Sequence, residues 1–542
     1  MDSACIPYTK LPKSSALFLD YLYHFDRVAS YYNGLPFELE SYRRAARELK
    51  AVPYSRKEIV EVLLRQNRAL GCGEATFANI RRLAGPDTLA VVTGQQVGLF
   101  SGPAFTIYKA LTTVKLAQHL SERGLPVVPV FWLATEDHDL AEVARAGVLD
   151  DQYNWVELAD RGERPAPQSS VGYVKLSGEI TATLDRLEGV LPAGESRDRL
   201  LGDLRAAYQP ETGWGEAFGR FLTRLLSPWG VVFLDPLDAE VHRLCAPLYE
   251  QAVQQAADLR ARLVDRSEQL VAAGYHAQVH VGEHSTLLFQ SHRGNRVALH
   301  QAPDARFSLG GASSVTAEQL LARVQNQPLD FTPNALFRPV IQDKLLPTVA
   351  YVSGAAELAY HAQTAVLYPA FGRSQPVVFP RAAFTLVDAR AERILKQYRL
   401  EVQDVWAGQE HLDGKIAAAG FAPGWAERLD QSERDLAALL ERLRRDIEVI
   451  DPTLIDVLGH TEEKMKYQME RLRGKLTRAA LKRSELLQRH GQTLLRVLTP
   501  QTHLQERVVS GVYFLGRAGY GLLDRLLAEI NVGCSDHRVA SY

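Results

Sequence analysis

Four consecutive polar residues, Glu136, Asp137, His138 and Asp139, form the densest group of side chains that could transfer a proton. They follow the apolar run 127–133, which predicts a strand buried on both faces. Side chains alternate on extended backbone, so we expect Glu136 and His138 on one side and the two aspartates on the other. A histidine oriented by a carboxylate is a typical general base. The structural alternative is a hydrogen-bonded strand end followed by a helix cap.

A glycine-rich loop lies upstream, between a strand predicted over 89–92 and a helix predicted over 104–120. Helix N-termini favour anions, so we expect this loop to contact a phosphate or a hydroxylated substrate. The residues expected to bind are Gln95, Gln96, Gly98, Ser101 and Gly102. The alternative is that these residues serve only the conformation of the loop. Lys109 on the helix is a further binding candidate, with a solvent-directed side chain as its alternative.

A third polar series interrupts an otherwise apolar segment. It contains Asn334, Arg338 and Gln342, which are spaced by four residues. An arginine here could pair with a carboxylate or a phosphate through two parallel hydrogen bonds. We therefore predict a substrate-binding role for this series.

A fourth group follows the segment Y-V-S that ends at Ser353. A helix that begins there would bring Glu357, Tyr360 and His361 within about one turn of each other, with Gly354 at its start. The carboxylate of Glu357 would suit a substrate that carries an amine. A buried structural network explains the same residues equally well.

These groups require an α/β fold that places strand ends together. The strands at 89–92 and 127–133, the helix between them and a further short strand at 231–234 predict a doubly wound parallel sheet. Ligands bind outside the carboxyl ends of such strands. Neither G-x-G-x-x-G nor G-x-x-x-x-G-K-[ST] occurs, so the common dinucleotide and P-loop sites lack their fingerprints.

Composition divides the chain into four parts. We predict an N-terminal helical arm packed on the core at 1–86, a Rossmann-like core at 87–386 with insertions at about 150–228 and 274–312, an α-helical coiled-coil domain at 387–499, and a tail returning to the core at 500–542. Within the insertions, strands are predicted at 154–158, 172–176, 277–281, 286–290 and 296–300. In the coiled-coil domain, helices are predicted at 432–450 and 453–498.

One heptad stripe in this domain predicts a homodimer. Leu458, Met465, Leu472 and Ala479 fall seven residues apart, as in a coiled-coil seam, and so long a helix needs a partner to bury its apolar side. The flanking basic residues could instead form an RNA-binding face, but stacking aromatic residues are missing there.

Overall composition bounds the class of protein. The 542 residues are 46% hydrophobic and carry a net charge of −2, which fits a globular protein and not a nucleic-acid binder. Neither a membrane-length apolar run nor a signal peptide is recognisable, so we expect a cytoplasmic protein that binds no membrane. Cys534 and His537 give half of a zinc-like spacing without a second half, so no metal site and no zinc are expected.

Four long segments resemble the bacillithiol biosynthesis enzymes that are proposed to add cysteine, the BshC family. They read T-G-Q-Q-V-G-L-F-S-G-P-A-F-T-I-Y-K at 93–109, P-V-F-W-L-A-T-E-D-H-D at 129–139, P-N-A-L-F-R-P-V-I-Q-D-K-L-L-P-T-V-A-Y-V-S-G-A-A-E-L-A-Y-H-A-Q at 333–363, and L-Q-E-R-V at 504–508. These motifs are long and specific, and they are spread over nearly the whole chain.

The resemblance implies a nucleotidyltransferase-type Rossmann core with connecting insertions, similar to class I aminoacyl-tRNA synthetases, and a coiled coil used for dimerisation. It also implies that the chain joins L-cysteine to glucosaminyl malate through an amide bond, the last step of bacillithiol synthesis. A carboxylate needs activation before it forms an amide, and by fold-level analogy ATP with Mg²⁺ would supply it. Clear H-I-G-H and K-M-S-K-S signatures are missing.

On this hypothesis the loop at 95–102 binds the anionic group, His138 or a neighbouring acid deprotonates the amine, and Arg338 holds a carboxylate. Two alternatives remain open. One is a nucleotide-dependent ligase or nucleotidyltransferase with another substrate. The other is a non-catalytic, nucleotide-binding dimeric scaffold.

Overall fold

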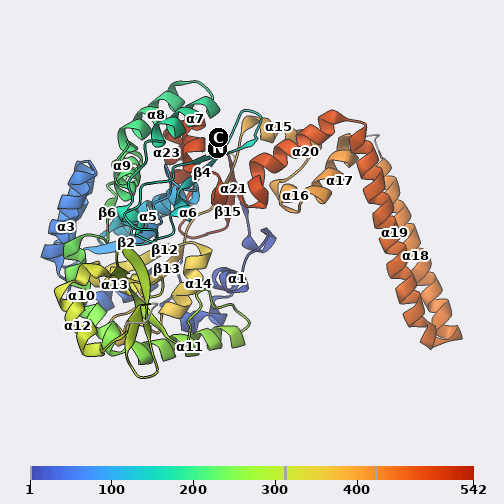
Figure 1. Ribbon diagram of the computed structural model, residues 1–542. Helices are drawn as coiled ribbons and strands as arrows, with labels where there is room; N and C mark the ends of the chain where they lie inside the picture. The colour runs from blue at the N-terminus through green and yellow to red at the C-terminus, as the bar shows by residue number, and fades with distance from the viewer. Residues whose placement is uncertain (1–2, 310–313, 421–423) are drawn as a thin grey trace.

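A five-stranded parallel sheet forms the centre of the computed structural model, which describes residues 3–309, 314–420 and 424–542 (Figure 1). Its strands are β2 (Leu89–Gln95), β3 (Val127–Leu133), β6 (Val232–Leu234), β12 (Thr348–Ser353) and β13 (Val377–Pro380). They lie in the order β13-β12-β2-β3-β6, and every neighbouring pair is parallel. Counted along the chain this is the order 3-2-1-4-5 of the doubly wound Rossmann fold, so the predicted fold class is confirmed.

Helices cover both faces of this sheet because its strands are apolar on both sides. One face packs against α2 (Leu39–Lys50) and α5 (Phe105–Glu122). The other packs against α3 (Arg56–Ala69), α10 (Ala239–Gln254) and α13 (Arg338–Leu345). Two further helices at the N-terminal end are α1 (Ala16–Tyr23) and α4 (Glu74–Leu83).

The strand order reverses between β2 and β12, which are neighbours although about 250 residues apart in the chain. The chain leaves the carboxyl end of β2 toward α5, and it leaves β12 directly into α14 (Ala355–Thr364). The connections on the two sides of this point run to opposite faces, which opens a crevice at the carboxyl edge. The fold therefore fixes where a ligand site is expected.

The first insertion is less β-rich than predicted. It contains one hairpin, β4 (Arg145–Leu149) and β5 (Trp155–Ala159), followed by α7 (Ile180–Val190), α8 (Glu195–Ala207) and α9 (Trp214–Leu226). The hairpin begins before the predicted boundary at 150. The predicted strand at 172–176 is wrong, because Lys175 forms only isolated bridges with Glu163 and Gly213.

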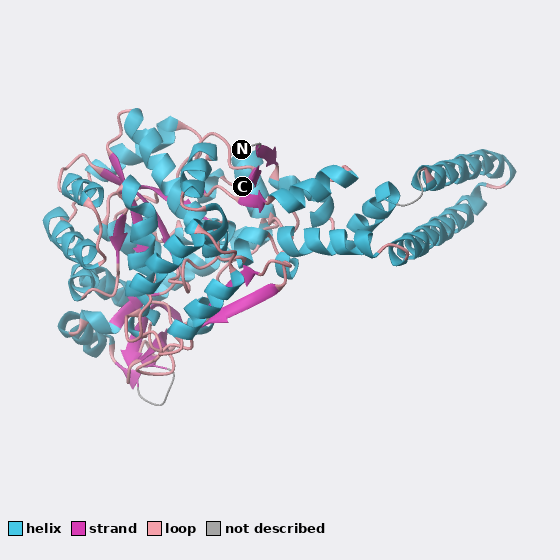
Figure 2. Ribbon diagram, turned by 90° about the horizontal axis from the view of Figure 1, so that it is seen from above, coloured by secondary structure: helices cyan, strands magenta, loops and turns pink. Residues whose placement is uncertain are grey.

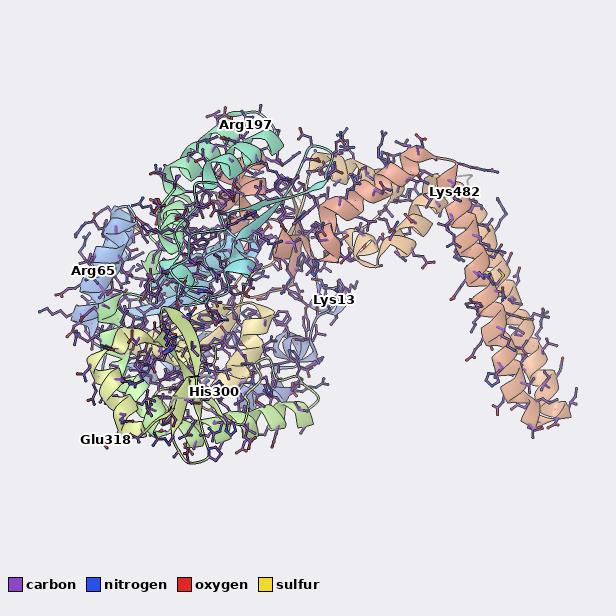
Figure 3. All side chains as sticks on the ribbon, viewed as in Figure 1. Lys13, Arg65, Arg197, His300, Glu318 and Lys482 are labelled. Carbon is purple, nitrogen blue, oxygen red and sulfur yellow. The ribbon has the colours of Figure 1, made fainter. Side chains whose placement is uncertain are left out.

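The second insertion is an antiparallel sheet in the order β10-β9-β8-β7-β11. Its elements are β7 (Ser285–His292), β8 (Asn295–Gln301), β9 (Phe307–Leu309), β10 (Ser314–Val315) and β11 (Phe331–Pro333), with α11 (Ala256–Ala272) before it and α12 (Ala317–Asn326) within it. Because β11 pairs with β7, the sheet ends well beyond the predicted limit at 312. Residues 310–312 of the predicted insertion lie outside the described residues. His300, labelled in Figure 3, marks β8.

Two further predictions, a strand at 277–281 and an unbroken helix at 453–498, are wrong. The segment 277–281 is not a strand, because the side chain of Gln363 bonds both the N–H and the C=O of Val279. The long helix at 453–498 is divided into α19 (Ile455–Lys482) and α20 (Glu485–Leu498), and Ser484 caps the second part. The division lets α20 turn back onto α17 (Gln409–Gly420).

The C-terminal helical domain combines a compact base with a projecting arm. The base contains α15 (Ala389–Tyr398), α16 (Val402–Trp406), α17 and α20, which pack against one another, and α20 also contacts β14 (Phe384–Val387). The arm is the antiparallel pair α18 (Trp425–Ile450) and α19, which extends away from the body in Figures 1 and 2. Among the described residues, none of the helices combines the length and the apolar character that crossing a membrane requires.

The two ends of the chain meet in a third sheet, β1-β15-β14, where β1 (Ser3–Ile6) and β14 flank β15 (His537–Ser541). The preceding tail helices are α21 (Gln505–Val508), α22 (Gly511–Ala518) and α23 (Gly521–Glu529). A buried ion pair holds the tail to the core, since Arg381 donates to both carboxylate oxygens of Glu506 at 2.7 and 2.9 Å. Burial alone would raise the pKa of Glu506, but Arg381 outweighs it and lowers that pKa.

Removal of this carboxylate should destabilise the protein strongly. We expect Glu506→Gln to lower the free energy of unfolding by about 3–5 kcal/mol, because it leaves the Arg381 guanidinium buried without a counter-charge. The loss should be present at pH 7 and shrink as the pH falls through the lowered pKa of Glu506. Urea unfolding measures it. Glu157→Gln, which opens the exposed pair with Arg145, is the control, and an equal effect of both substitutions would contradict the anchoring role.

Candidate active site

A cavity of about 660 Å³ lies at the carboxyl edge of the parallel sheet, where the antiparallel sheet and the segment of the tail near Arg507 close it. Ten of the residues predicted from the sequence line it: Gln95, Gln96, Lys109, Glu136, Asp137, Asn334, Arg338, Gly354, Glu357 and Tyr360. Seven do not: Gly98, Ser101, Gly102, His138, Asp139, Gln342 and His361. The structure therefore brings together residues from four segments that are far apart in the chain.

A buried ion pair spans the point where the strand order reverses. The ammonium of Lys109, on α5, lies 2.6 Å from a carboxylate oxygen of Glu357, on α14. It also donates to the backbone oxygen of Gly94 and to Oε1 of Gln95. Lys109 is 1% exposed, so the alternative of a solvent-directed side chain is wrong. Burial alone would raise the pKa of Glu357, but Lys109 and the N–H of Gly354 lower it, so Glu357 is ionised.

Hydrogen bonds connect this pair to Arg338. The hydroxyl of Tyr351 donates to Glu357 at 2.7 Å. Arg338 donates to the hydroxyls of Tyr351 and Tyr360 at 3.3 and 3.1 Å and to Oε1 of Gln342 at 3.0 Å. Gln342 is therefore a buried support for Arg338 and not a ligand contact. Asn334 caps the turn that leads into α13, because its side chain accepts from two backbone N–H groups there.

Glu136 and Asp137 of the E-D-H-D cluster both line the cavity, and Glu136 is the more deeply buried of the two. It is 6% exposed and makes no hydrogen bond with the described residues, while Arg296, Arg338 and Asp235 act on it electrostatically. Burial raises its pKa to about 7, and the two arginines limit that rise. A carboxyl group with this pKa exchanges a proton near neutral pH, as a general base or acid must.

The alternation expected for the cluster is wrong, because the chain leaves extended conformation at Thr135. Asp137 folds over the turn and accepts from the backbone N–H groups of His138 and Asp139. It also accepts from Gln96 at 2.7 Å, and these contacts lower its pKa although burial opposes them. The turn directs His138 away from the cavity.

His138 and Asp139 have supporting roles. Nδ1 of His138 accepts from Arg296 at 3.1 Å, which assigns the ring proton to Nε2. Burial and Arg296 both lower the pKa of His138, so it is neutral at pH 7. Asp139 caps α6 (Leu140–Val143) by accepting from the N–H of Glu142. The structural alternative therefore describes Asp139 correctly.

The glycine-rich loop is not open to a ligand beyond Gln96. Gly98 and Gly102 are in such close contact that a Cβ on Gly98 would lie 2.7 Å from the Cα of Gly102. Ser101 is fully buried against Ser510, and the backbone of Val509 accepts from the first N–H at the start of α5. The tail thus occupies the position where an anion was predicted.

His361 lies beneath the cavity wall. Its ring packs against Tyr351 and Tyr360, with ring centroids 4.8 and 5.3 Å away, and it has no exposed surface. Burial and Arg338 lower its pKa to about 3, so this imidazole stays neutral. We therefore assign it to the packing of the wall.

Sequence reasoning missed four arginines of the cavity, Arg260, Arg296, Arg381 and Arg507. Arg296 stands at the start of β8, and its only signal is an alternating strand pattern that does not reveal which site it faces. Arg507 belongs to the L-Q-E-R-V segment. That segment supported the resemblance to the family, but no role was predicted for its residues. Among residues 3–309, 314–420 and 424–542, no group of three or more His, Cys, Asp and Glu side chains is arranged to hold a metal ion.

The raised pKa of Glu136 predicts a pH-dependent stability difference. Between pH 4.5 and about 7 the folded protein keeps a proton that the unfolded chain releases, so wild-type stability falls as the pH rises. Glu136→Gln removes this decrease in stability, because glutamine does not titrate. We expect its melting temperature to equal that of wild type near pH 4.5 and to exceed it increasingly up to pH 7. Thermal unfolding across this range measures it, and a constant difference would contradict the assignment.

Comparisons with known proteins agree with this architecture. The family model "Bacillithiol biosynthesis BshC, N-terminal Rossmann-like domain" matches residues 1–382, and the model for the C-terminal coiled-coil domain of BshC matches residues 384–542.

Relatives match over nearly their whole length. A protein from Solibacter usitatus is 37% identical over 99% of both chains, and one from Koribacter versatilis is 36% identical over 99% of both. A relative from Geobacillus thermodenitrificans is 28% identical over 92% of this chain and 93% of its own. All three carry the name "Putative cysteine ligase BshC". The two family models cover both domains of the structure, and the chain belongs to the BshC family of bacillithiol biosynthesis proteins.

Proposed function

We propose that this protein is a ligase that joins the carboxyl group of L-cysteine to the amine of glucosaminyl malate. The reaction forms one C–N bond and formally releases water. The observation that carries this proposal is Glu136, an acid with a pKa of about 7 that enters a cation-lined cavity at the carboxyl edge of the sheet. The names of the relatives support the choice of cysteine.

Glu136 acts as the base in this proposal. An amine attacks a carbonyl carbon only in its neutral form, so the ammonium of the substrate must lose a proton near the site of attack. The ionised form of Glu136 accepts that proton. Because this form predominates above pH 7, the rate should rise with pH through this value. Asp137 is held by hydrogen bonds that lower its pKa, so it is a poorer base at the same edge.

ATP is the proposed source of activation, and the cavity has features that suit it. Aliphatic side chains of Leu287, Leu288 and Leu299 line one side, while Arg507 and the N-terminus of α14 border the sheet side. The side chain of Arg507 makes no hydrogen bond or ion pair with the described residues and is free to meet a phosphate. When bound, ATP would activate the cysteine carboxylate as a mixed anhydride with its α-phosphate and release pyrophosphate, and attack by the amine would then release AMP. Mg²⁺ would accompany the phosphates.

A direct assay tests the proposal. Purified protein is incubated with glucosaminyl malate, L-cysteine and ATP-Mg, with a parallel reaction that omits ATP, and mass spectrometry detects the cysteinyl product. We expect product only when ATP is present. Product without ATP would exclude ATP activation, and the lack of product in both reactions would count against the ligase assignment.

A substitution at Glu136 tests its assignment as the general base. Glu136→Gln should lower the rate by about 10²-fold or more, because Gln cannot accept the proton. The pH dependence near 7 should disappear with it. Glu188→Gln, which changes an exposed residue on α7, is the control and should keep wild-type activity. Full activity of Glu136→Gln would transfer the role to another group.

We also propose that the projecting arm of α18 and α19 mediates a homodimer. Met465 and Leu472 of the predicted heptad stripe of α19 are 39% and 45% exposed, and Leu476, four residues after Leu472, is 41% exposed. The contact with α18 therefore leaves an apolar stripe uncovered in the single chain. A second copy of the arm would bury it.

Charge placed on this stripe should dissociate the dimer. We expect Met465→Glu/Leu472→Glu to halve the molar mass measured by light scattering, because two buried carboxylates oppose packing. Lys464→Glu adds a similar charge change beside the stripe and should leave the mass unchanged. A wild-type monomer, or a double variant with unchanged mass, would refute the dimer.

A further inference from the structure

The cations of the cavity differ in how their charge is compensated. Lys109 and Arg381 each bind a carboxylate of the protein, at 2.6 and 2.7 Å. Arg296 and Arg338 contact no carboxylate among the described residues, although both are partly buried and line the cavity. The protein thus pairs Lys109 and Arg381 with a carboxylate in direct contact. It leaves the other arginines of the cavity, Arg260, Arg296, Arg338 and Arg507, without such a contact among the described residues.

Neutral groups hold Arg296 in one orientation. Its Nε donates to Thr332 Oγ1 at 2.8 Å, Nη1 to His138 Nδ1 at 3.1 Å, and Nη2 to the backbone oxygen of Pro333 at 2.8 Å. The guanidinium also lies 3.7 Å from the ring centroid of Phe289. Three of the five N–H groups of an arginine are thereby used, and the other two remain for a ligand.

Arg338 is held in the same manner. Its contacts are the side-chain oxygen of Gln342 and the hydroxyls of Tyr351 and Tyr360. The ring centroids of Tyr351 and Trp132 lie 5.3 and 6.0 Å from the guanidinium carbon. Here too the hydrogen bonds leave N–H groups free and the positive charge intact.

The other uncompensated arginines of the cavity differ in this respect. Arg260 makes a single side-chain hydrogen bond, to Gln301 at 3.3 Å, and Arg507 makes none with the described residues. A guanidinium that is already oriented loses less conformational entropy when it binds a ligand. Fixed orientation therefore distinguishes Arg296 and Arg338 from cations that only add to the field of the cavity.

Both guanidinium groups and Glu136 line one cavity, and both arginines act electrostatically on the carboxyl group of Glu136. They come from different layers, since Arg296 belongs to the antiparallel sheet and Arg338 to α13 of the core. A group bound by both would bridge these layers beside the proposed base.

We propose that Arg296 and Arg338 form a clamp for one oxyanion of the substrate, with His138 and Gln342 acting as positioning residues behind it. An oxyanion supplies the directly bound anionic partner that both arginines lack among the described residues, and its oxygens accept from the free N–H groups of both arginines. This assignment rests on the proposed function, which provides two sources of such a group. They are the malyl carboxylates of glucosaminyl malate and the phosphates of ATP. The position beside Glu136, the base for the amine of the same substrate, favours the carboxylate.

Binding without turnover tests the clamp. Isothermal titration calorimetry with L-malate, and separately with inorganic phosphate, is performed on wild type, Arg296→Gln and Arg338→Gln. Each substitution should weaken L-malate binding by at least about tenfold, since it removes charge-assisted hydrogen bonds. Weaker binding of phosphate alone would assign the clamp to a phosphoryl group. Wild type that binds neither anion, or variants that bind both as wild type does, would overturn the proposal.

Two matched variants separate the clamp from general effects. Arg260→Gln removes the same charge from the cavity and should change L-malate affinity less than threefold. Arg56→Gln removes a guanidinium that also donates to backbone carbonyls and lies over Tyr54, but outside the cavity, and should bind as wild type. An equal loss in Arg260→Gln would mean that only net charge matters, which contradicts a clamp.

The positioning roles have a distinct readout. His138→Asn keeps a side-chain acceptor for Arg296, whereas His138→Ala does not. We expect His138→Ala to raise KM for glucosaminyl malate while kcat changes little, and His138→Asn to restore part of the affinity. A fall in kcat with unchanged KM would instead indicate a base and would contradict this role.

The calorimetric outcomes are independent of the ligase assay. Anion binding that depends on both arginines, in a protein that forms no product, would support the clamp and reject the proposed function. Product formation with an unchanged KM in both arginine variants would do the reverse.

Discussion

A buried lysine joins the two halves of the parallel sheet at the point where the strand order reverses. The ammonium of Lys109 bonds the end of β2 through Gly94 and Gln95, and it bonds α14 through Glu357. A single charge taken out of water requires a close counter-charge and further hydrogen bonds, so all these groups must hold their positions together. This ion pair closes the crevice of the fold on its sheet side. Glu357 also accepts a hydrogen bond from Tyr351 and so orients that residue of the cavity wall.

From this pair the polar network extends along the cavity, and the partners of its cations change from carboxylates to neutral groups. Near α5 and the tail, Lys109 and Arg381 each have a carboxylate partner, and these ion pairs serve the structure. Farther along, Arg338 and Arg296 are held by hydroxyls, an amide and an imidazole, all of them neutral. Glu136 lies among these uncompensated charges, and burial gives it a pKa near neutrality. The part of the site suited to substrate chemistry is thus where the protein leaves its own charges unpaired.

The cavity is assembled from three pieces that contribute different properties. The parallel sheet supplies the edge at which strand ends converge. The antiparallel sheet adds Arg296 and an apolar wall, so this insertion is part of the site and not a peripheral addition. The tail contributes Arg507 and, through Glu506, fixes Arg381 from behind. Because the tail also fills the space next to Ser101, it decides which half of the glycine-rich loop remains accessible.

The sequence by itself determined the α/β class, the central strands, the helical character of the C-terminal coiled-coil domain and ten residues of the cavity. Apolar periodicity and polar strand ends are local signals, so a sequence pattern is enough to recognise them. It did not determine the directions of His138 and Ser101, the break before Ser484, or the role of Arg296. A turn after Thr135, a tail about 400 residues away and a second sheet decide these features. Such contacts join segments with no shared local pattern, so only the tertiary structure shows which polar groups face a ligand and which support the wall.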